Sequence, residues 1–283
     1  MTSEGSPPAP DPGDGTAPGT HEVTLDLDTS VAHVARVYDY WLGGKDNFAA
    51  DRAAGEQAIQ AYPDIVYSVR ANRAFLARTV RYLAGEAGIR QFLDIGTGIP
   101  TANNTHEVAQ DVAPGSNVVY VDNDPVVLTH ARALLVSGDQ GHTNYIDADL
   151  RDTGRILAEA AQTLDFSRPV AIMLMAILQH IDEAEDPYAI VNSLLDAVPP
   201  GSYLAISHPA NDINSPGVRR LASRLNELMP MKLRFRSRTE VARFFDGLEL
   251  LKPGLVRAPE WRPDSDADLD NPAAVWAGVA RKN

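Results

Sequence analysis

Apolar residues recur every three or four positions in the first third of the chain, which is the period of helices with one buried face. Val31, Val34, Ala35 and Tyr38 share such a face, and Trp41 falls beside it. The motif Leu42-Gly43-Gly44-Lys45-Asp46-Asn47 then interrupts the pattern. Ser68 is a suitable N-cap for a later helix. The pattern predicts helices over residues 31–41, 53–62 and 69–84.

From residue 90 onward, short apolar runs alternate with further helical segments, as in chains that form a parallel sheet. The run 170–175 is nearly all apolar, which is typical of a central strand covered on both faces. The predicted strands are 90–95, 117–122, 144–146, 170–175 and 203–207. The predicted helices between and after them are 101–111, 124–136, 154–164, 186–197 and 218–228.

Two apolar runs close the chain, at residues 248–251 and 275–280, and we expect them to pair as an antiparallel edge of the sheet. Before them, Ser237-Arg238-Thr239-Glu240 has the spacing of a capping box and predicts a helix start. The fold class is therefore α/β: a doubly wound, Rossmann-like sheet, mostly parallel, with an antiparallel C-terminal edge and an N-terminal helical cap.

Composition and charge exclude several classes of protein. The 283 residues are 44% hydrophobic and 22% charged, and the net charge of −13 opposes binding to nucleic acid phosphates. With no cysteine, the chain has neither disulfides nor thiolate metal ligands, and we expect no metal. No apolar run is long enough for a membrane span and no signal pattern opens the chain, so a cytoplasmic location is expected. Four arginines, at positions 234, 236, 238 and 243, suit the solvated edge of a strand.

Residues 92–98 carry the strongest chemical signal. The apolar run Phe92-Leu93-Asp94-Ile95 ends in the turn Gly96-Thr97-Gly98, where backbone can approach a ligand closely because glycine has no Cβ. A nicotinamide dinucleotide site requires a third glycine, which lets the pyrophosphate lie against a helix N-terminus. Ile99-Pro100-Thr101 follows instead. The turn therefore predicts a ribose-containing ligand without a pyrophosphate.

Acidic residues lie at the tips of the first three predicted strands: Asp94, Asp122 and Asp149. Asp122 could accept hydrogen bonds from both ribose hydroxyls, Asp149 could accept one from the adenine amine, and Asp94 could lie near a cationic amino group. Taken singly, each has a structural interpretation; Asp122, for example, could cap the next helix. Together they favour S-adenosylmethionine (SAM). The expected cofactor-binding residues are Asp94, Gly96, Thr97, Gly98, Asp122, Asn123, Asp149, Leu150 and Ala176.

The chain resembles the class I SAM-dependent methyltransferases, and more narrowly an actinobacterial S-adenosyl methyltransferase family once catalogued as a domain of unknown function. The resemblance runs from about residue 28 to the C-terminus. It implies a SAM-binding methyltransferase domain over 89–283 and a helical cap over 22–88. The Pro- and Gly-rich composition of residues 1–21 predicts a disordered tail. Pro100 departs from the broad class I pattern and agrees with the narrower family. The motifs that carry the resemblance are residues 35–48, 70–73, 92–101, 120–125 and 277–282.

The methyl acceptor should bind just after the fourth strand, where the chain reads Met175-Ala176-Ile177-Leu178-Gln179-His180-Ile181-Asp182. His180 is the first candidate for a catalytic base, because an ordinary imidazole titrates near neutral pH. The alternative is a histidine held by Asp182 or by backbone at a helix start. His208, after the fifth strand, is a second candidate.

The N-terminal segment could close over the site. Expected ligand-contacting residues of this cap are Tyr38, Trp41, Asn47, Arg70 and Asn72, with Phe48 as a further aromatic. The alternative is that Tyr38 and Trp41 form the packed face of a helix. These features predict a SAM-dependent methyltransferase that acts on a small molecule, with no nucleic acid or membrane partner and with the oligomeric state left open. The alternatives are a non-catalytic SAM-binding regulator and, least favoured, a nicotinamide oxidoreductase.

Overall fold

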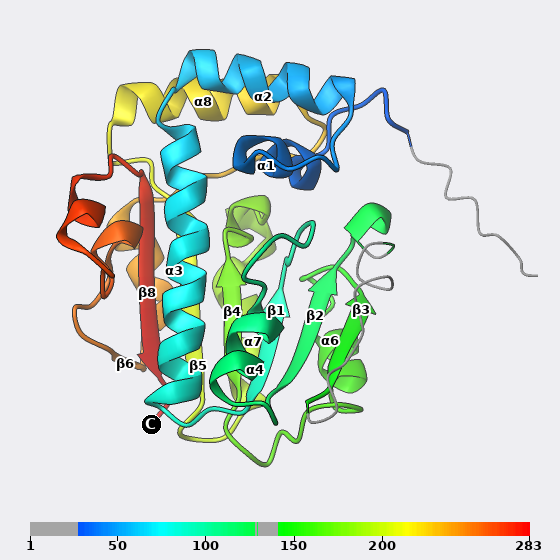
Figure 1. The fold of residues 1–283 in the computed structure, drawn as a ribbon, viewed down its shortest axis with the longest axis vertical. Coiled ribbons are helices and arrows are strands. Elements are labelled where there is room, and N and C mark those ends of the chain that lie inside the picture. Colours follow the sequence, from blue (N-terminus) through cyan, green and yellow to red (C-terminus); the bar gives the residue numbers. More distant parts are fainter. Residues whose placement is uncertain (1–27, 128, 130–140) are drawn as a thin grey trace, which may run out of the picture.

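A mixed sheet forms the centre of the molecule (Figure 1). The computed structural model describes residues 28–127, 129 and 141–283; the expected tail over 1–21 and most of the expected helix 124–136 lie outside them. The strands are ordered β3-β2-β1-β4-β5-β8-β6, and β7 also pairs with β8. Their bounds are β1 Gln91–Ile95, β2 Asn117–Asp122, β3 Thr143–Asp147, β4 Ala171–Met175, β5 Tyr203–Pro209, β6 Glu249–Leu250, β7 Val256–Arg257 and β8 Val275–Arg281.

The first five strands are parallel, and β8 runs antiparallel to β5, β6 and β7. The expected pairing of the two closing runs is thus confirmed, although β8 lies inside the sheet and β6 forms its edge. The two-residue strand β7 was not predicted, because two half-buried residues leave no alternating pattern.

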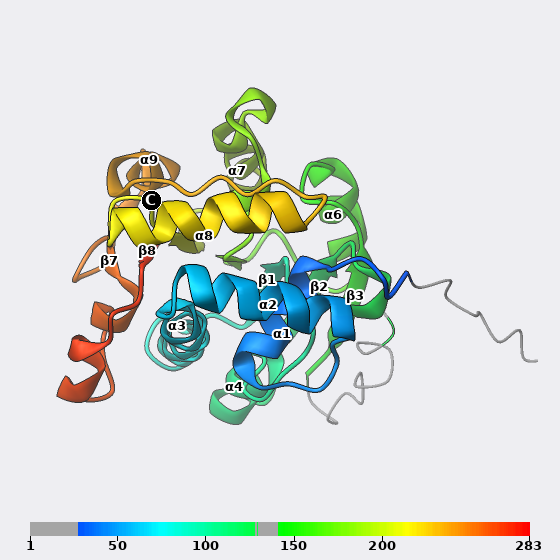
Figure 2. The same cartoon turned by 90° about the horizontal axis from the view of Figure 1, so that it is seen from above.

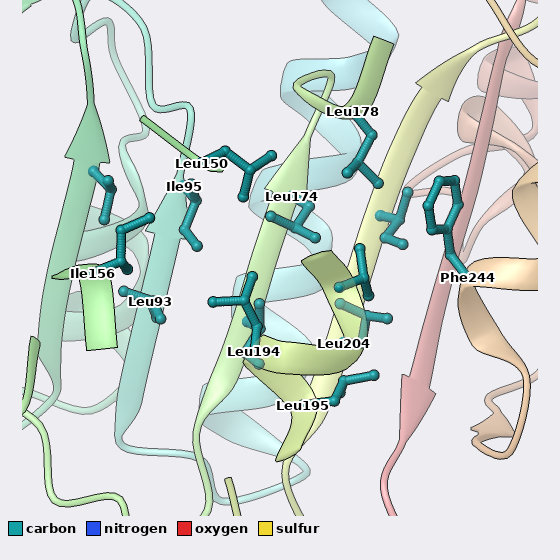
Figure 3. Close-up of a cluster of buried hydrophobic side chains, with 14 of the residues drawn as sticks. Leu93, Ile95, Leu150, Ile156, Leu174, Leu178, Leu194, Leu195, Leu204 and Phe244 are labelled. Atoms are coloured by element: carbon teal, nitrogen blue, oxygen red, sulfur yellow. The ribbon is translucent and has the colours of Figure 1, made fainter. Parts of the chain in front are cut away.

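Helices cover both faces of the sheet. On one face, Leu93, Leu174 and Leu204 pack against Ile156 of α6 (Thr153–Ala160) and Leu194 of α7 (Pro187–Asp196), as Figure 3 shows. Alternate residues of the same strands point to the other face, because side chains of a strand alternate. There Phe92 and Met173 pack against Phe75 and Leu83 of α3 (Ile65–Gly85) and Ala109 of α4 (Thr105–Val112).

A separate helical layer lies over the carboxyl ends of the parallel strands (Figures 1 and 2). It consists of α1 (Val34–Leu42), α2 (Ala49–Ala61) and α8 (Ser215–Leu228), which share a core with the start of α3. Most of α3 instead packs on the sheet. Packing therefore does not follow the expected boundary at residue 88: α3 belongs mainly to the sheet layer, and α8 from the C-terminal half completes the cap.

Two helix starts test the capping predictions. Ser237 begins α9 (Arg238–Ala242) as predicted, since its hydroxyl accepts from Glu240 N and its own N donates to the Glu240 carboxylate. The Ser68 prediction is wrong: α3 begins at Ile65, and Ser68 lies in its first turns, where its hydroxyl donates to Asp64 O. Within the described residues, no helix combines the length and apolarity needed to cross a bilayer.

Candidate functional site

A cavity opens at the carboxyl ends of β1 to β4, beneath α1 and α3. In a doubly wound sheet, ligands bind at this end, where the direction of strand order reverses; here that point lies between β1 and β4. The nine residues expected to bind the cofactor all line the cavity: Asp94, Gly96, Thr97, Gly98, Asp122, Asn123, Asp149, Leu150 and Ala176.

The backbone conformation of the turn after β1 requires glycine at positions 96 and 98. Gly96 and Gly98 have φ angles of 77° and 65°, in the left-handed region that favours glycine. A Cβ on Gly96 would lie 2.5 Å from the side chain of Ile177, in the loop after β4. A Cβ on Gly98 would meet no atom within 4 Å. The lack of a side chain at Gly96 therefore allows the turn after β1 to contact the loop after β4. The space next to Gly98 is open.

Asp122 holds the glycine turn in place. Its Oδ2 accepts a hydrogen bond from Gly98 N at 2.8 Å, and its Oδ1 accepts one from Asp124 N at 3.0 Å. Burial raises the pKa of its carboxyl despite these bonds. Each carboxylate oxygen has more than one lone pair, so Asp122 can still accept from ligand hydroxyls.

Asp94 is a buried acid of the cavity wall, only 3% exposed. Its Oδ2 accepts from the Thr105 hydroxyl at 2.5 Å. Burial raises the pKa of Asp94 to about 6, while the Thr105 hydrogen bond and the Arg73 charge act in the opposite direction. Asp94 is therefore an acid that a cation in the cavity would stabilise in its charged form.

At the third strand tip, Asp149 belongs to a charged cluster that sequence analysis did not identify. Arg151 donates to both oxygens of Asp149 at 3.0 and 3.2 Å, to the Glu185 carboxylate and to His180 O. Asn123 donates to Asp149 Oδ2 at 3.0 Å. The cluster joins the tips of β2 and β3 to the loop after β4, and so forms one side of the cavity.

The loop after β4 begins with a strained residue. Ala176 has a φ of 50°, which is unusual for a residue with a Cβ, and its N donates to both the backbone O and the hydroxyl of Ser207, at 3.0 Å each. Strain of this kind persists where the surrounding contacts impose it. Three further hydrogen bonds connect Ser207 to the cap: Ser207 Oγ donates to Asn72, Asn72 Nδ2 donates to the Tyr38 hydroxyl, and that hydroxyl donates to Val69 O.

His180 lines the cavity, but burial lowers its pKa to about 4, so the ring is neutral at pH 7. Gln179 fixes the tautomer. Its Nε2 donates to Ala176 O at 2.5 Å and lies 3.3 Å from His180 Nε2; because an amide nitrogen only donates, His180 Nε2 accepts and Nδ1 carries the proton. Within the described residues, His180 Nδ1 and Gln179 Oε1 are buried without a partner. His180, which was expected to be a catalytic base, is thus a hydrogen-bond donor without an acceptor among the described residues.

The structure brings two of the five expected cap residues to the cavity, Tyr38 and Asn72. Trp41 instead packs in the cap core, 7% exposed, with its indole N–H bound to Gly55 O. Asn47 binds Asp39 and Gly44 O, outside the cavity lining. Arg70 points to solvent from the far side of α3, since it is two residues from Asn72 and so nearly opposite it on the helix.

His208 and the arginine series differ from expectation. His208 is fully buried outside the cavity lining; its Nδ1 donates to Pro209 O, and its Nε2 accepts from Arg236 at 3.0 Å. Arg236 is also fully buried, bound to Glu183 and to the carbonyls of Leu178 and Ile181. Arg234, Arg238 and Arg243 are exposed as predicted, but the series does not lie on a strand. Arg236 instead fastens the loop after β4 to β5 from within the core.

Four charged residues of the cavity wall were missed: His33, Asp39, Arg73 and Arg151. His33 precedes α1, and its Nδ1 lies 2.7 Å from Asp124 Oδ2, which joins the cap to the tip of β2. A signal for Arg73 was present: it lies three residues before Leu76, which also lines the cavity, and such residues share a helix face. Nothing in the local pattern singles out His33 or Arg151.

The fold and the nine gathered residues define a class I SAM-dependent methyltransferase. A family model described as S-adenosyl methyltransferase matches residues 20–283, and the chain belongs to that family. A search of curated proteins finds no match.

Solved structures agree with this assignment. A DUF574 family protein from Streptomyces avermitilis is 46% identical, with a TM-score of 0.87 over 90% of this chain and 99% of its own. A candidate methyltransferase from Thermobifida fusca is 44% identical, with a TM-score of 0.85 over 93% and 100%. The plantazolicin methyltransferase BpumL, 12% identical with a TM-score of 0.51 over 88% and 96%, shares the fold.

The cavity suits SAM on chemical grounds. The glycine turn places no Cβ at its mouth, and the residues after it supply no pyrophosphate site. Asp122 and Asp149 would accept from the ribose and the adenine amine, and the buried Asp94 would gain a cationic partner. When bound, SAM supplies an electrophilic methyl group, and the chain's own residues position the acceptor for in-line attack.

Proposed function

We propose that this methyltransferase acts on a small molecule bound between the cap and the loop after β4. The observation that carries the proposal is the part of the cavity wall that the acids of the strand tips do not form. It consists of apolar side chains with a few polar groups among them, as in small-molecule sites. These apolar residues are Val34, Leu42, Leu76, Met175, Ile177 and Met231.

His180 and Gln179 supply the polar groups of that wall. The Nδ1–H donor of His180 and the Oε1 acceptor of Gln179 lie on adjacent residues, buried and unpartnered within the described part of the chain. An acceptor group that both donates and accepts, such as an amine or hydroxyl, would satisfy the two atoms once these side chains turn toward the cavity, because neither atom is exposed to it as it stands. Because a histidine with a pKa of about 4 is a weak base, a nucleophile that needs no prior deprotonation, such as a neutral amine, is favoured.

The proposal includes no nucleic acid partner, because a net charge of −13 opposes binding to phosphates and four aspartates line the cavity: Asp39, Asp94, Asp122 and Asp149. It also includes action in the cytoplasm, a location that suits a chain without cysteine.

Labelled SAM tests the acceptor class. The protein would be incubated with methyl-radiolabelled SAM and a cell extract of Streptomyces avermitilis, the macromolecules separated by dialysis, and the labelled small molecules separated from SAM by chromatography. The proposal expects a labelled small molecule other than SAM with the wild type and not with Asp122→Ala. Protein-dependent label retained with macromolecules would contradict it.

A further inference from the structure

Asp39 is the acid of the cavity wall that has no expected partner in SAM. The other three aspartates of the wall lie at strand tips, where Asp122, Asp149 and Asp94 have expected partners in the ribose, the adenine amine and the ammonium group. Asp39 instead lies on α1, in the cap. It precedes Leu42 of the apolar wall by three residues, and such residues share a helix face. Asp39 therefore lies on the part of the wall that is proposed to bind the acceptor.

The loop after α1 holds one oxygen of the Asp39 carboxylate. Asp46 N donates to Oδ2 at 3.0 Å, and Asn47 Nδ2 donates to the same oxygen at 2.8 Å. Gly44 N donates to the backbone O of Asp39, and a Cβ on Gly44 would overlap Oδ1. The glycine-containing motif over 42–47 therefore fixes the orientation of the Asp39 carboxylate before any ligand binds.

Asp39 is 3% exposed and forms no ion pair with any described residue. Its Oδ1 accepts no hydrogen bond from the described part of the chain, yet it is not fully buried, so it is open to the cavity that Asp39 lines. Arg36, one turn earlier on α1, pairs with Asp51 instead. Arg52 reaches Asp39 only through Asn47. Burial of a charge costs free energy unless an opposite charge accompanies it, so a ligand cation would stabilise this carboxylate.

We propose that Asp39 binds a cationic group of the methyl acceptor, an amine or a guanidine. This inference rests on the proposed function and names the substrate class within it. A cation at Oδ1 would donate a charge-assisted hydrogen bond, which is stronger than a bond between neutral groups. The rest of the acceptor would then contact the apolar side chains beside Asp39, among them Leu42. Asp39 thereby selects molecules that carry an amine or a guanidine over neutral and purely anionic ones.

The charge of the labelled product tests the substrate class. The wild type would be incubated with methyl-radiolabelled SAM and extract of Streptomyces avermitilis, and the labelled small molecules, freed of SAM, applied to a strong cation exchanger at pH 2. Carboxyl groups are largely protonated at that pH, so retention reports an amine or a guanidine, and we expect the product to be retained. A labelled product that passes through would overturn this inference and leave the proposed function intact. If no labelled small molecule formed at all, the proposed function itself would fail, and this inference with it.

Asp39→Asn tests whether Asp39 is the group that binds the cation. Asparagine keeps the shape and an oxygen for the loop, and it loses the charge. We expect calorimetry to show unchanged affinity for S-adenosylhomocysteine, and the initial rate of product labelling to fall roughly 10- to 100-fold, as for loss of a charged hydrogen bond. Asp111→Asn, the same change on the exposed surface of α4, is the matched control and should behave as the wild type in both measurements.

Two results with Asp39→Asn would overturn the inference. One is an unchanged rate of labelling. The other is a loss of S-adenosylhomocysteine affinity in a variant whose circular dichroism matches the wild type, because Asp39 would then serve the cofactor. The charge of the wild-type product tests the inference even if Asp39→Asn does not fold.

Discussion

At the scale of single residues, the chemistry of this cavity depends on how burial alters each titratable group. Asp94 and His180 illustrate opposite cases. Burial raises the pKa of the acid to about 6 and lowers that of the imidazole to about 4, because it disfavours the charged form of each. At pH 7, above its pKa, Asp94 is therefore mostly deprotonated and can pair with a cation, and His180 is a neutral donor.

Asp94 predicts a pH dependence of cofactor binding. Below about pH 6 the carboxyl is protonated and must lose its proton before it can pair with the ligand ammonium, so S-adenosylhomocysteine affinity should rise between pH 5 and pH 7 and then level off. Methylthioadenosine, which has no ammonium, reports on the other groups near Asp94, among them Arg73, Tyr120 and Asp122. Its affinity should change less in calorimetry. The same pH dependence for both ligands would contradict this role for Asp94.

We expect His180 to affect the rate of methyl transfer but not the affinity for SAM. His180→Ala should leave SAM affinity unchanged and lower the rate of methyl transfer roughly 10- to 100-fold, because the acceptor loses a hydrogen bond. The rate is measured with the extract fraction that contains the acceptor. His180→Asn keeps a donor and should retain more activity than His180→Ala. Full activity in His180→Ala would remove His180 from the reaction.

At the scale of elements, the strand tips were predictable and the cap was not. A strand, its turn and the residue at its tip are contiguous, so Asp94, Gly96 and Asp122 could be placed from local pattern alone. On the cap helix, Tyr38 and Trp41 share one apolar face, yet the cavity wall includes the first and the cap core the second. That division depends on contacts with other helices: the Trp41 indole donates to Gly55 O of α2, and the Tyr38 hydroxyl bonds with Asn72 of α3. The burial of Arg236 likewise arises from long-range contacts that its local spacing conceals.

The turn after β1 predicts a difference between its two glycines. Gly96→Ala adds a Cβ that overlaps Ile177 in addition to the cost of a positive φ, and should lower the free energy of unfolding by about 3 kcal/mol. Gly98→Ala has the backbone cost alone and should lose about 1 kcal/mol. Urea denaturation measures both. Equal losses would contradict the close contact between the two loops.

At the scale of the whole molecule, the cap and the sheet are joined at the cavity. Hydrogen bonds run from Tyr38 through Asn72 to Ser207 and Ala176, and His33 meets Asp124 across the mouth. Arg236 adds a second connection near the cavity, because it binds the loop after β4, Glu183 and His208 of β5. The cavity walls therefore come from segments spread along the chain.

We expect Arg236 to contribute more to the free energy of unfolding than Arg234. Arg236→Met removes a buried cation and leaves His208 Nε2 and two buried carbonyls without their donor, so the free energy of unfolding should fall by about 3 kcal/mol. Arg234→Met removes a side chain that is 42% exposed and pairs with Glu183 and Glu240 at the surface, and should cost less than about 1 kcal/mol. Equal effects in urea denaturation would contradict the buried role of Arg236.

The central claim is that the acids at the strand tips bind a phosphate-free adenosyl cofactor. The most direct measurement is calorimetric titration of the wild type and Asp122→Ala with S-adenosylhomocysteine and NAD. We expect the wild type to bind S-adenosylhomocysteine and not NAD, and Asp122→Ala to bind it more weakly by about 1–3 kcal/mol, because ligand hydroxyls lose a buried acceptor. Binding of NAD without S-adenosylhomocysteine, or unchanged affinity in Asp122→Ala, would contradict the account.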